Sequence, residues 1–516
     1  MKPTRGELGE RGIGATEIAP GAARVFVVGM LAALFGVSAL EVRTAWTPAI
    51  SAWSGLGGSR GWLGVNAALR DGLHAFEDRL REEAWLTKTL VPPLQRFKAE
   101  WLKLGNESVV LGADGWLHYA PDVAALTDRI PAEQLARAAS AIRDFAAYLG
   151  GRGIDLILVP VPPKTAYAAT TLAPRARATP IRRTEFAEFW RALERDHIRV
   201  FDPDSAWSNS PPESLYLRAD THWTFEAMER VAANLADRLR QLYGFAPPRS
   251  QRFERDEEAI FGIGDLARML GDGLPPEWGA PQDQQIRPVR DGPFAWRPVA
   301  GSPVFLLGDS FSNIYSQEAL GWGTGAGFAE QLSFHLGFPI DRIVRNDAGA
   351  RGTRELLARE LAAGRDRLAG VRVVVWQFAE RELFHGDWRS VSFVLGTPRH
   401  TGFTPPPPSP AVWTATVAAV SAIPAPKRVP YADHIASIHL VDVAGEGAEG
   451  AEALAYAWSL TNHHRAAAAR LRPGDRLRFA VRSWAEMADQ LDGVNRSELD
   501  DDRFFDAEPV WVEPLP

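Results

Sequence analysis

Along the middle of the chain, segments with the apolar pattern of a strand alternate with segments that have the period of a helix. Residues 154–161 (IDLILVPV) form a continuous apolar run, which is typical of a strand buried on both faces of a sheet. Residues 133–149, just before this run, repeat apolar side chains with the period of a helix. Further strands are predicted at 198–202, 303–307, 342–346 and 372–378, with a helix at 225–242. Such alternation predicts an α/β domain with a mostly parallel sheet and helices on both faces.

The remaining segments set the limits of this domain, which we place at residues 106–400. Residues 402–410 (GFTPPPPSP) contain four consecutive prolines, which favour a stiff extended chain and predict a linker at 401–411. Beyond the linker, residues 412–516 alternate strand-like segments with Gly, Pro and Asp turns, which predicts a smaller β-rich domain suited to binding carbohydrate or protein. Residues 248–300, with scattered Pro, Gly and charge, are expected to form a long irregular insertion.

Residues 25–40 (VFVVGMLAALFGVSAL) form an apolar run without a charged residue. A membrane span needs about 17–25 apolar residues, so this run predicts a short membrane anchor or the core of a signal peptide, with a buried helix as the alternative. Basic residues before the run place residues 1–24 in the cytoplasm. A helical connector at 41–105 would then lead to a body on the periplasmic or extracytoplasmic face of the cytoplasmic membrane, held there by one membrane pass.

Composition narrows the classes of function. The 516 residues are 46% hydrophobic with a net charge of −7, which fits a globular protein and gives no basic footprint for a nucleic acid. The absence of cysteine excludes disulfides, thiol nucleophiles and cysteine metal sites. The sequence has no HExxH motif, and no metal or cofactor is expected.

Two short motifs carry candidate chemistry. Gly308-Asp309-Ser310 follows the apolar strand VFLL, and a serine at such a strand-to-helix turn has its hydroxyl exposed at the carboxyl end of the sheet. Asp220 and His222 lie two positions apart in an extended segment, so they point to the same side and the carboxylate can orient the imidazole. Either motif alone also suits an ordinary turn or a packed histidine. The two together indicate a Ser-His-Asp arrangement for nucleophilic catalysis.

The pair DTHWT (220–224) and GDSFS (308–312), in that order, resembles the alginate O-acetyltransferase AlgJ/AlgX family with its SGNH-hydrolase-like domain. The resemblance covers roughly residues 100–390. It implies an SGNH-like α/β fold and an enzyme that takes acetyl groups from a membrane-bound acyltransferase partner and places them on polysaccharide hydroxyls. Carried over to this chain, Ser310 would be the nucleophile, His222 the general base and Asp220 the acid that orients it.

Several other residues are candidates for binding the substrate. Trp223 and Tyr315 are aromatic residues close to the motifs, where sugar rings could stack, and packing in the core is the alternative for each. Asn346 and Arg351 flank the end of a later strand, where a second oxyanion donor besides the Ser310 N–H would be expected. Lys164 in VPPK is interpreted as a surface lysine, with a place in the cleft as the alternative.

Three functions compete at this point. The first is acetyl transfer to an extracytoplasmic polysaccharide through an acetyl-Ser310 intermediate. The second is a carbohydrate acetyl esterase, since the same three residues would release acetate if water reached the acyl-enzyme. The third is a polysaccharide-binding assembly protein without catalysis. The intact Ser, His and Asp favour the two enzymatic functions, with transfer as the leading hypothesis.

Overall fold

The computed structural model describes residues 85–516 except 173–180, 208–209, 212–213, 247–251, 272–273, 347–348, 397–410, 427–428, 430, 492, 500–503, 505–506 and 516. Gln95 to Pro516 belong to one compact unit. The first described element is helix α4 (Trp85–Leu102). The predicted linker at 401–411 lies outside the described residues, apart from its last position.

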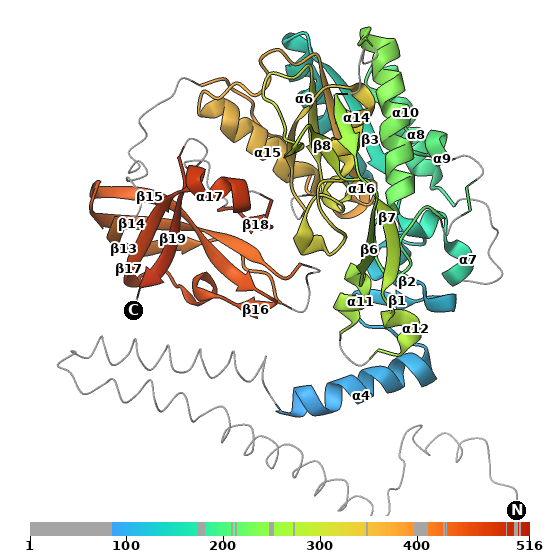
Figure 1. Ribbon diagram of the computed structural model, residues 1–516, viewed down its shortest axis with the longest axis horizontal. Helices are drawn as coiled ribbons and strands as arrows, with labels where there is room; N and C mark the ends of the chain where they lie inside the picture. Colours follow the sequence, from blue (N-terminus) through green and yellow to red (C-terminus); the bar gives the residue numbers. More distant parts are fainter. Residues whose placement is uncertain are drawn as a thin grey trace, which may run out of the picture. The chain divides into compact units, whose positions relative to one another are not determined.

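A five-stranded parallel sheet forms the centre of the α/β domain, with the strand order β11-β10-β12-β3-β4. Figure 1 labels β3 within this sheet. Each strand lies at a predicted position, although the second one along the chain is reduced to two residues. The strands are β3 (Asp155–Val161), β4 (Arg199–Val200), β10 (Val304–Gly308), β11 (Asp341–Val344) and β12 (Val373–Ala379). The mostly parallel sheet expected from the alternating pattern is thereby confirmed.

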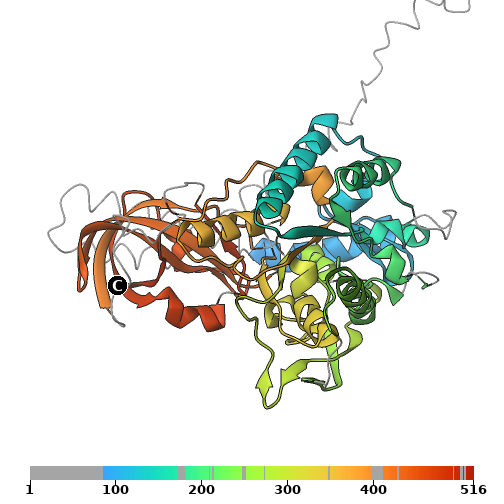
Figure 2. The same ribbon diagram turned by 90° about the horizontal axis from the view of Figure 1, so that it is seen from above.

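Helices cover both faces of this sheet (Figure 2). Alternate residues of β3, β10 and β12 enter two different cores, because successive side chains of a strand point to opposite faces. One core packs against α10 (Phe225–Tyr243) and α14 (Phe328–Leu336). The other packs against α6 (Ala132–Gly151), α8 (Thr184–Arg195) and α15 (Gly349–Ala362).

Helix α10 shows how local sequence sets an element's ends. The Thr224 side chain accepts a hydrogen bond from the Ala227 N–H and so caps the first turn. Gly244 follows the last turn with φ of 64°, a left-handed conformation that glycine adopts at little cost. The helix therefore begins directly after the DTHW segment and fixes the position where that segment ends.

The insertion at 248–300 is more regular than the sequence suggested. It contains two small antiparallel sheets, one of β6 and β7 and the other of β5, β8 and β9 in that order. Its strands are β5 (Phe253–Arg255), β6 (Glu258–Gly262), β7 (Gln282–Ile286), β8 (Val289–Asp291) and β9 (Phe294–Ala295), with helices α11 (Asp265–Leu270) and α12 (Pro276–Gly279) between β6 and β7. The strands are short and carry many charged residues, so their alternation was not visible in the sequence.

Residues after the linker form a separate barrel-like region of antiparallel and parallel pairings, in agreement with the predicted β-rich domain. Strand β15 pairs with β14 on one side and with β19 on the other, so that β15, β19, β17, β13 and β14 close a ring. These strands are β13 (Ala411–Val420), β14 (His434–Gly445), β15 (Ala448–Thr461), β17 (Arg476–Ser483) and β19 (Val510–Leu515), with the short β16 (His464–Arg465) and β18 (Arg496–Ser497) at the edges.

The predicted single-pass membrane anchor must be corrected. In the part of the chain that the structure describes, no helix is both long and apolar enough to cross a membrane. The anchor was assigned to residues 25–40, which lie outside the described residues together with the predicted cytoplasmic segment 1–24. The anchored, extracytoplasmic location therefore has no support and is not carried further.

Candidate active site

Ser310 lies at the turn where the central strand β10 ends and the short helix α13 (Ser310–Asn313) begins. Asp309 caps this helix, since its Oδ1 accepts a hydrogen bond of 2.9 Å from the Phe311 N–H. The same carboxylate accepts hydrogen bonds from Gln377 Nε2 at 2.8 Å and from the Ala379 N–H at 2.6 Å. Both come from the neighbouring strand β12, so the serine turn is fixed to two adjacent strands.

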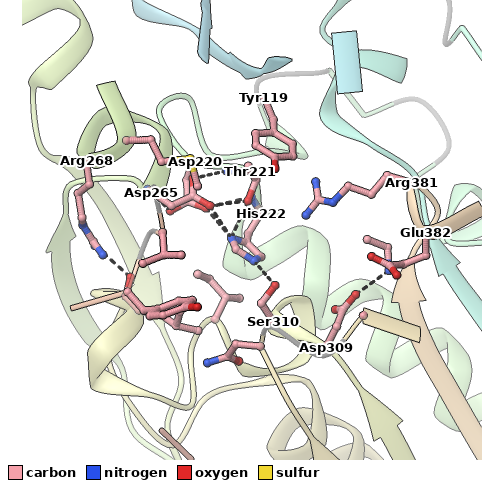
Figure 3. Close-up of a pocket in the computed structure, with 18 residues that line it drawn as sticks. Tyr119, Asp220, Thr221, His222, Asp265, Arg268, Asp309, Ser310, Arg381 and Glu382 are labelled. Atoms are coloured by element: carbon pink, nitrogen blue, oxygen red, sulfur yellow. Dashed lines mark hydrogen bonds and ion pairs between the residues drawn. The ribbon is translucent and has the colours of Figure 1, made fainter. Parts of the chain in front are cut away.

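His222 and Asp220 reach Ser310 from a loop that precedes helix α10 (Figure 3). His222 Nε2 lies 2.8 Å from Ser310 Oγ, and His222 Nδ1 lies 2.6 Å from Asp220 Oδ1. The His222 N–H also donates to Asp220 Oδ1, at 3.0 Å. The predicted trio is thus brought together in one hydrogen-bonded chain, although 88 residues separate the serine from the histidine.

The second oxygen of Asp220 is held just as firmly. Asp220 Oδ2 accepts hydrogen bonds of 2.9 Å from Trp322 Nε1 and from the Asp265 N–H at the start of α11. Trp322, Asp220 and His222 are all buried. With both oxygens occupied, the carboxylate has one available orientation, and this fixes the tautomer of His222 with its proton on Nδ1.

Two buried charged residues that support this loop were not predicted. Asp265 accepts hydrogen bonds from the Thr221 N–H at 2.7 Å and from the Thr221 hydroxyl at 2.6 Å. Lys164, expected at the surface, is only 2% exposed, and its Nζ donates to the backbone carbonyls of Leu217, Arg218 and Asp220. The position of Lys164 just after β3, at the carboxyl end of the sheet, was the one sequence signal for it.

Electrostatics favour the charged form of His222. Burial by itself would raise the pKa of Asp220, but the charge and hydrogen bond of His222 hold it well below its usual range. Burial by itself would lower the pKa of His222, but Asp220 outweighs burial and the pKa is raised, with a smaller contribution from Asp265. An imidazolium at this position is therefore stabilised.

The supporting charges are themselves shifted by burial. Burial and the charge of Asp220 raise the pKa of Asp265 to about 6. Burial lowers the pKa of Lys164 to about 8, against the opposing effect of Asp265 and Asp220. Both shifts follow from burial of the charged group, combined with the charges of its neighbours.

Ser310 and His222 open onto a pocket of about 290 Å³. Two residues that the sequence did not single out, Tyr119 and Arg381, line its wall together with Asn346. Figure 3 shows the Arg381 guanidinium directed into this pocket, beside the His222 ring. Tyr431, from the region after the linker, also lines it. The pocket thus has the hydrogen-bonded Ser310 and His222 on one side and the Arg381 cation on the other.

The predicted substrate-binding residues are distributed differently. Asn346 lines the pocket, whereas Arg351 pairs with Asp387 at 2.6 Å and is not among the lining residues. Trp223 and Tyr315 are fully buried, and the Tyr315 hydroxyl donates to the Trp223 carbonyl at 2.8 Å. The two aromatic residues therefore support the loop from the core.

Among the described residues, Asp220, His222 and Asp265 are close enough to be considered as metal ligands, with their candidate ligand atoms within 4.8 Å of one another. Each of them already has hydrogen-bonding partners in the arrangement above. We therefore interpret this group as a network that positions the imidazole.

Comparison with known proteins identifies the family. The model of the SGNH hydrolase-like domain of the acetyltransferase AlgX matches residues 109–380, which is more than half of the chain. The chain belongs to this family. No curated protein matches it closely enough to be counted as a relative.

The comparison also found similar solved structures, all with TM-scores below 0.5. The O-acetyltransferase domain of Pseudomonas putida AlgJ is 23% identical with a TM-score of 0.42, over 54% of this chain and 92% of that one. Pseudomonas aeruginosa AlgX is 17% identical with a TM-score of 0.40, over 61% of this chain and 78% of that one. Bacillus cereus PatB1 is 11% identical with a TM-score of 0.35, over 55% of this chain and 99% of that one.

Proposed function

We propose that this protein is a polysaccharide O-acetyltransferase that works through an acetyl-Ser310 intermediate. The observation that carries the proposal is the hydrogen-bonded chain from Ser310 Oγ through His222 to Asp220, at 2.8 and 2.6 Å, opening onto a pocket. Membership of the AlgX acetyltransferase family supports acetyl transfer as the reaction.

In the first half of the proposed reaction, Ser310 Oγ attacks the carbonyl carbon of an acetyl donor while its proton passes to His222 Nε2. The tetrahedral intermediate collapses, and the leaving group of the donor departs with the proton from His222. Asp220 stays ionised and stabilises the imidazolium between these two steps. The product of this half is an acetyl ester on Ser310.

In the second half, a hydroxyl of the acceptor loses its proton to His222 Nε2 and attacks the acetyl carbon. Collapse of the second intermediate returns the proton to Ser310 Oγ and leaves the acetyl group on the acceptor. We propose a polysaccharide hydroxyl as the acceptor and, as the resemblance implied, a membrane-bound acyltransferase as the source of the acetyl groups.

The experiment uses the full chain with an activated acetyl ester such as p-nitrophenyl acetate, with and without a panel of oligosaccharides. Transfer predicts that a suitable oligosaccharide raises the rate of ester cleavage and carries the acetyl group, which mass spectrometry detects. Release of acetate alone across the panel would replace the transferase with an esterase. Absence of any turnover, with the fold intact, would favour a binding protein.

A further inference from the structure

Arg381 lies at the same edge of the sheet as Ser310. Strand β12 ends at Ala379, two residues before Arg381, and runs parallel to β10, which ends at Gly308, two residues before Ser310. Because parallel neighbouring strands have their carboxyl ends at one edge, both residues emerge side by side above the sheet. Both line the same pocket.

The guanidinium of Arg381 is fixed in position by three contacts. Its Nη1 donates to Asp122 Oδ2 at 3.0 Å, and Asp122 is only 3% exposed. The guanidinium carbon lies 5.4 Å from the centre of the Tyr119 ring and 5.6 Å from that of Phe311, the residue directly after the nucleophile. Stacking of this kind holds a guanidinium plane while leaving its edge available for donation.

The Arg381 guanidinium has more N–H donors than hydrogen-bond acceptors within the described residues. A guanidinium carries five N–H donors, and in the described part of the chain Asp122 is the hydrogen-bond acceptor that Arg381 reaches. Its side chain is 18% exposed, and Figure 3 shows its guanidinium pointing into the pocket towards the side on which Ser310 and His222 lie. Burial by itself would lower the pKa of Arg381, but Asp122 together with Asp309 and Glu382 outweighs burial and the pKa is raised.

Asn346, one of the two residues that the sequence offered as a second donor, has a hydrogen-bond partner at each end of its amide. Its Oδ1 accepts from Asn313 Nδ2 at 2.9 Å, and its Nδ2 donates to Gln317 Oε1 at 2.6 Å. It lies after β11, on the other side of β10 from Arg381. Its amide is oriented by these two partners, whereas the Arg381 guanidinium points into the pocket from the opposite wall.

We propose that Arg381 is a catalytic residue that donates a hydrogen bond to the oxyanion formed during acyl transfer, and this inference rests on the proposed function. When Ser310 Oγ bonds to the acyl carbon, the electron pair of the C=O bond moves onto oxygen and the proton of the hydroxyl moves to His222. The negative oxygen then accepts from the Ser310 N–H and from Arg381. On collapse, the electron pair re-forms C=O and the leaving group takes the proton from His222.

The test measures acylation with an uncharged acetyl ester and no sugar, so that acceptor binding does not enter. Arg381→Gln should lower the rate constant of pre-steady-state p-nitrophenol release from p-nitrophenyl acetate by about 10²–10³-fold. The loss should lie in the maximal rate and not in ester binding, because the interaction strengthens only in the transition state. Arg381→Lys should recover part of the rate, since it keeps the charge. Arg389→Gln, which removes an exposed arginine paired with Asp387, should act like the wild type.

Two comparisons separate this role from the alternatives. Asp122→Asn breaks the ion pair but keeps the cation, so it should lose much less activity than Arg381→Gln; equal losses would make Arg381 a structural tie and overturn the proposal. A wild-type acylation rate in Arg381→Gln, with losses only when an anionic oligosaccharide is the acceptor, would also overturn it. If Arg381→Gln does not fold, as judged by near-UV circular dichroism, the acylation rates of Arg381→Lys and Asp122→Asn are compared instead. A larger loss in Arg381→Lys supports the oxyanion role, and equal losses overturn it.

Failure of the proposed function has a different signature. In that case Ser310→Ala would turn over the ester as fast as the wild type, whatever the Arg381 variants do. An active wild type with an inactive Ser310→Ala and a fully active Arg381→Gln would leave the proposed function standing and remove only the oxyanion role.

Discussion

At the scale of single residues, the site depends on how completely Asp220 is held. Four donors from three residues occupy its two oxygens: the His222 imidazole and N–H on one, and the Trp322 indole N–H and the Asp265 N–H on the other. A carboxylate fixed in this way sets both the orientation and the tautomer of the base. An amide in the same place would preserve the shape and lose the charge.

Asp220→Asn is therefore expected to lower kcat/KM by about 10⁴-fold with little change in fold, because an amide cannot stabilise the imidazolium and favours the wrong tautomer. Steady-state kinetics with an activated ester measures the loss, and circular dichroism checks the fold. Asp196→Asn, which removes an exposed partner of Arg143, serves as the matched control and should be neutral. A loss below tenfold in Asp220→Asn would contradict the assigned role.

Substitution of Asp265 should shift the pH dependence of activity instead of abolishing it. Its negative charge raises the pKa of His222, and the base works only when neutral. Asp265→Asn removes that charge above pH about 6, where Asp265 is ionised, so the pKa of His222 falls and the acid limb of kcat/KM moves to lower pH. The pH–rate profile measures the shift, and Asp283→Asn, an exposed change, should leave it in place. A shift to higher pH would show that this sign is wrong.

At the scale of elements, the site is assembled where the carboxyl ends of parallel strands meet loops from the insertion. Gly264, which precedes helix α11, shows how tight this contact is. A Cβ at this position would lie 2.0 Å from the Ala219 carbonyl oxygen and 2.7 Å from the Asp220 nitrogen. Its φ of −64° suits any residue, so it is space and not backbone conformation that requires glycine.

Gly264→Ala should therefore lower activity by about 10²-fold although Gly264 does not line the pocket, because displacing Asp220 by about 1 Å misaligns the base. Overpacking of this kind also costs about 1–3 kcal/mol of stability. Gly150→Ala is the matched control, since a Cβ there meets nothing within 4 Å inside helix α6 and should leave activity unchanged. Wild-type kinetics in Gly264→Ala would mean that the loop tolerates the displacement.

The sequence predicted those elements whose pattern is local. Strands β3, β10 and β12 are continuous apolar runs, and helix α10 has its cap and its terminal glycine in the sequence, so all four were found near their true ends. The triad geometry also followed from two local motifs. Asp265, Arg381 and the buried Lys164 could not be assigned, because their partners lie 44 to 259 positions away in the chain.

At the scale of the whole molecule, a largely buried group of charges joins the α/β domain to the barrel-like region. Arg359 from helix α15 pairs with Glu498 at 3.1 Å, and Arg496 pairs with the same carboxylate at 3.0 Å. Arg345, after β11, donates to the Arg496 carbonyl at 2.7 Å. Burial by itself would raise the pKa of Glu498, but Arg496, Arg359 and Arg345 outweigh it and the pKa is lowered.

Glu498→Gln should destabilise the protein by about 3 kcal/mol at pH 7, because three arginines lose their shared counter-charge. A carboxylate with a lowered pKa stabilises the fold above its ordinary pKa and loses this effect as the pH falls through the folded value. The difference in the free energy of unfolding between Glu498→Gln and the wild type should therefore shrink towards pH 3. Chemical denaturation at both pH values measures it, with the exposed Glu446→Gln as control. A difference that does not change with pH would contradict the ionic origin.

The central claim is that Ser310 carries the acetyl group between donor and acceptor. The most direct measurement is rapid acid quenching of the protein with an activated acetyl ester, followed by mass spectrometry of its peptides. The account predicts one acetyl group on the peptide that contains Ser310, lost when a suitable oligosaccharide is added and found again on the sugar. Ser310→Ala should show neither the label nor the transfer. Acetyl transfer at the wild-type rate in Ser310→Ala, or a label only on other residues, would contradict the account.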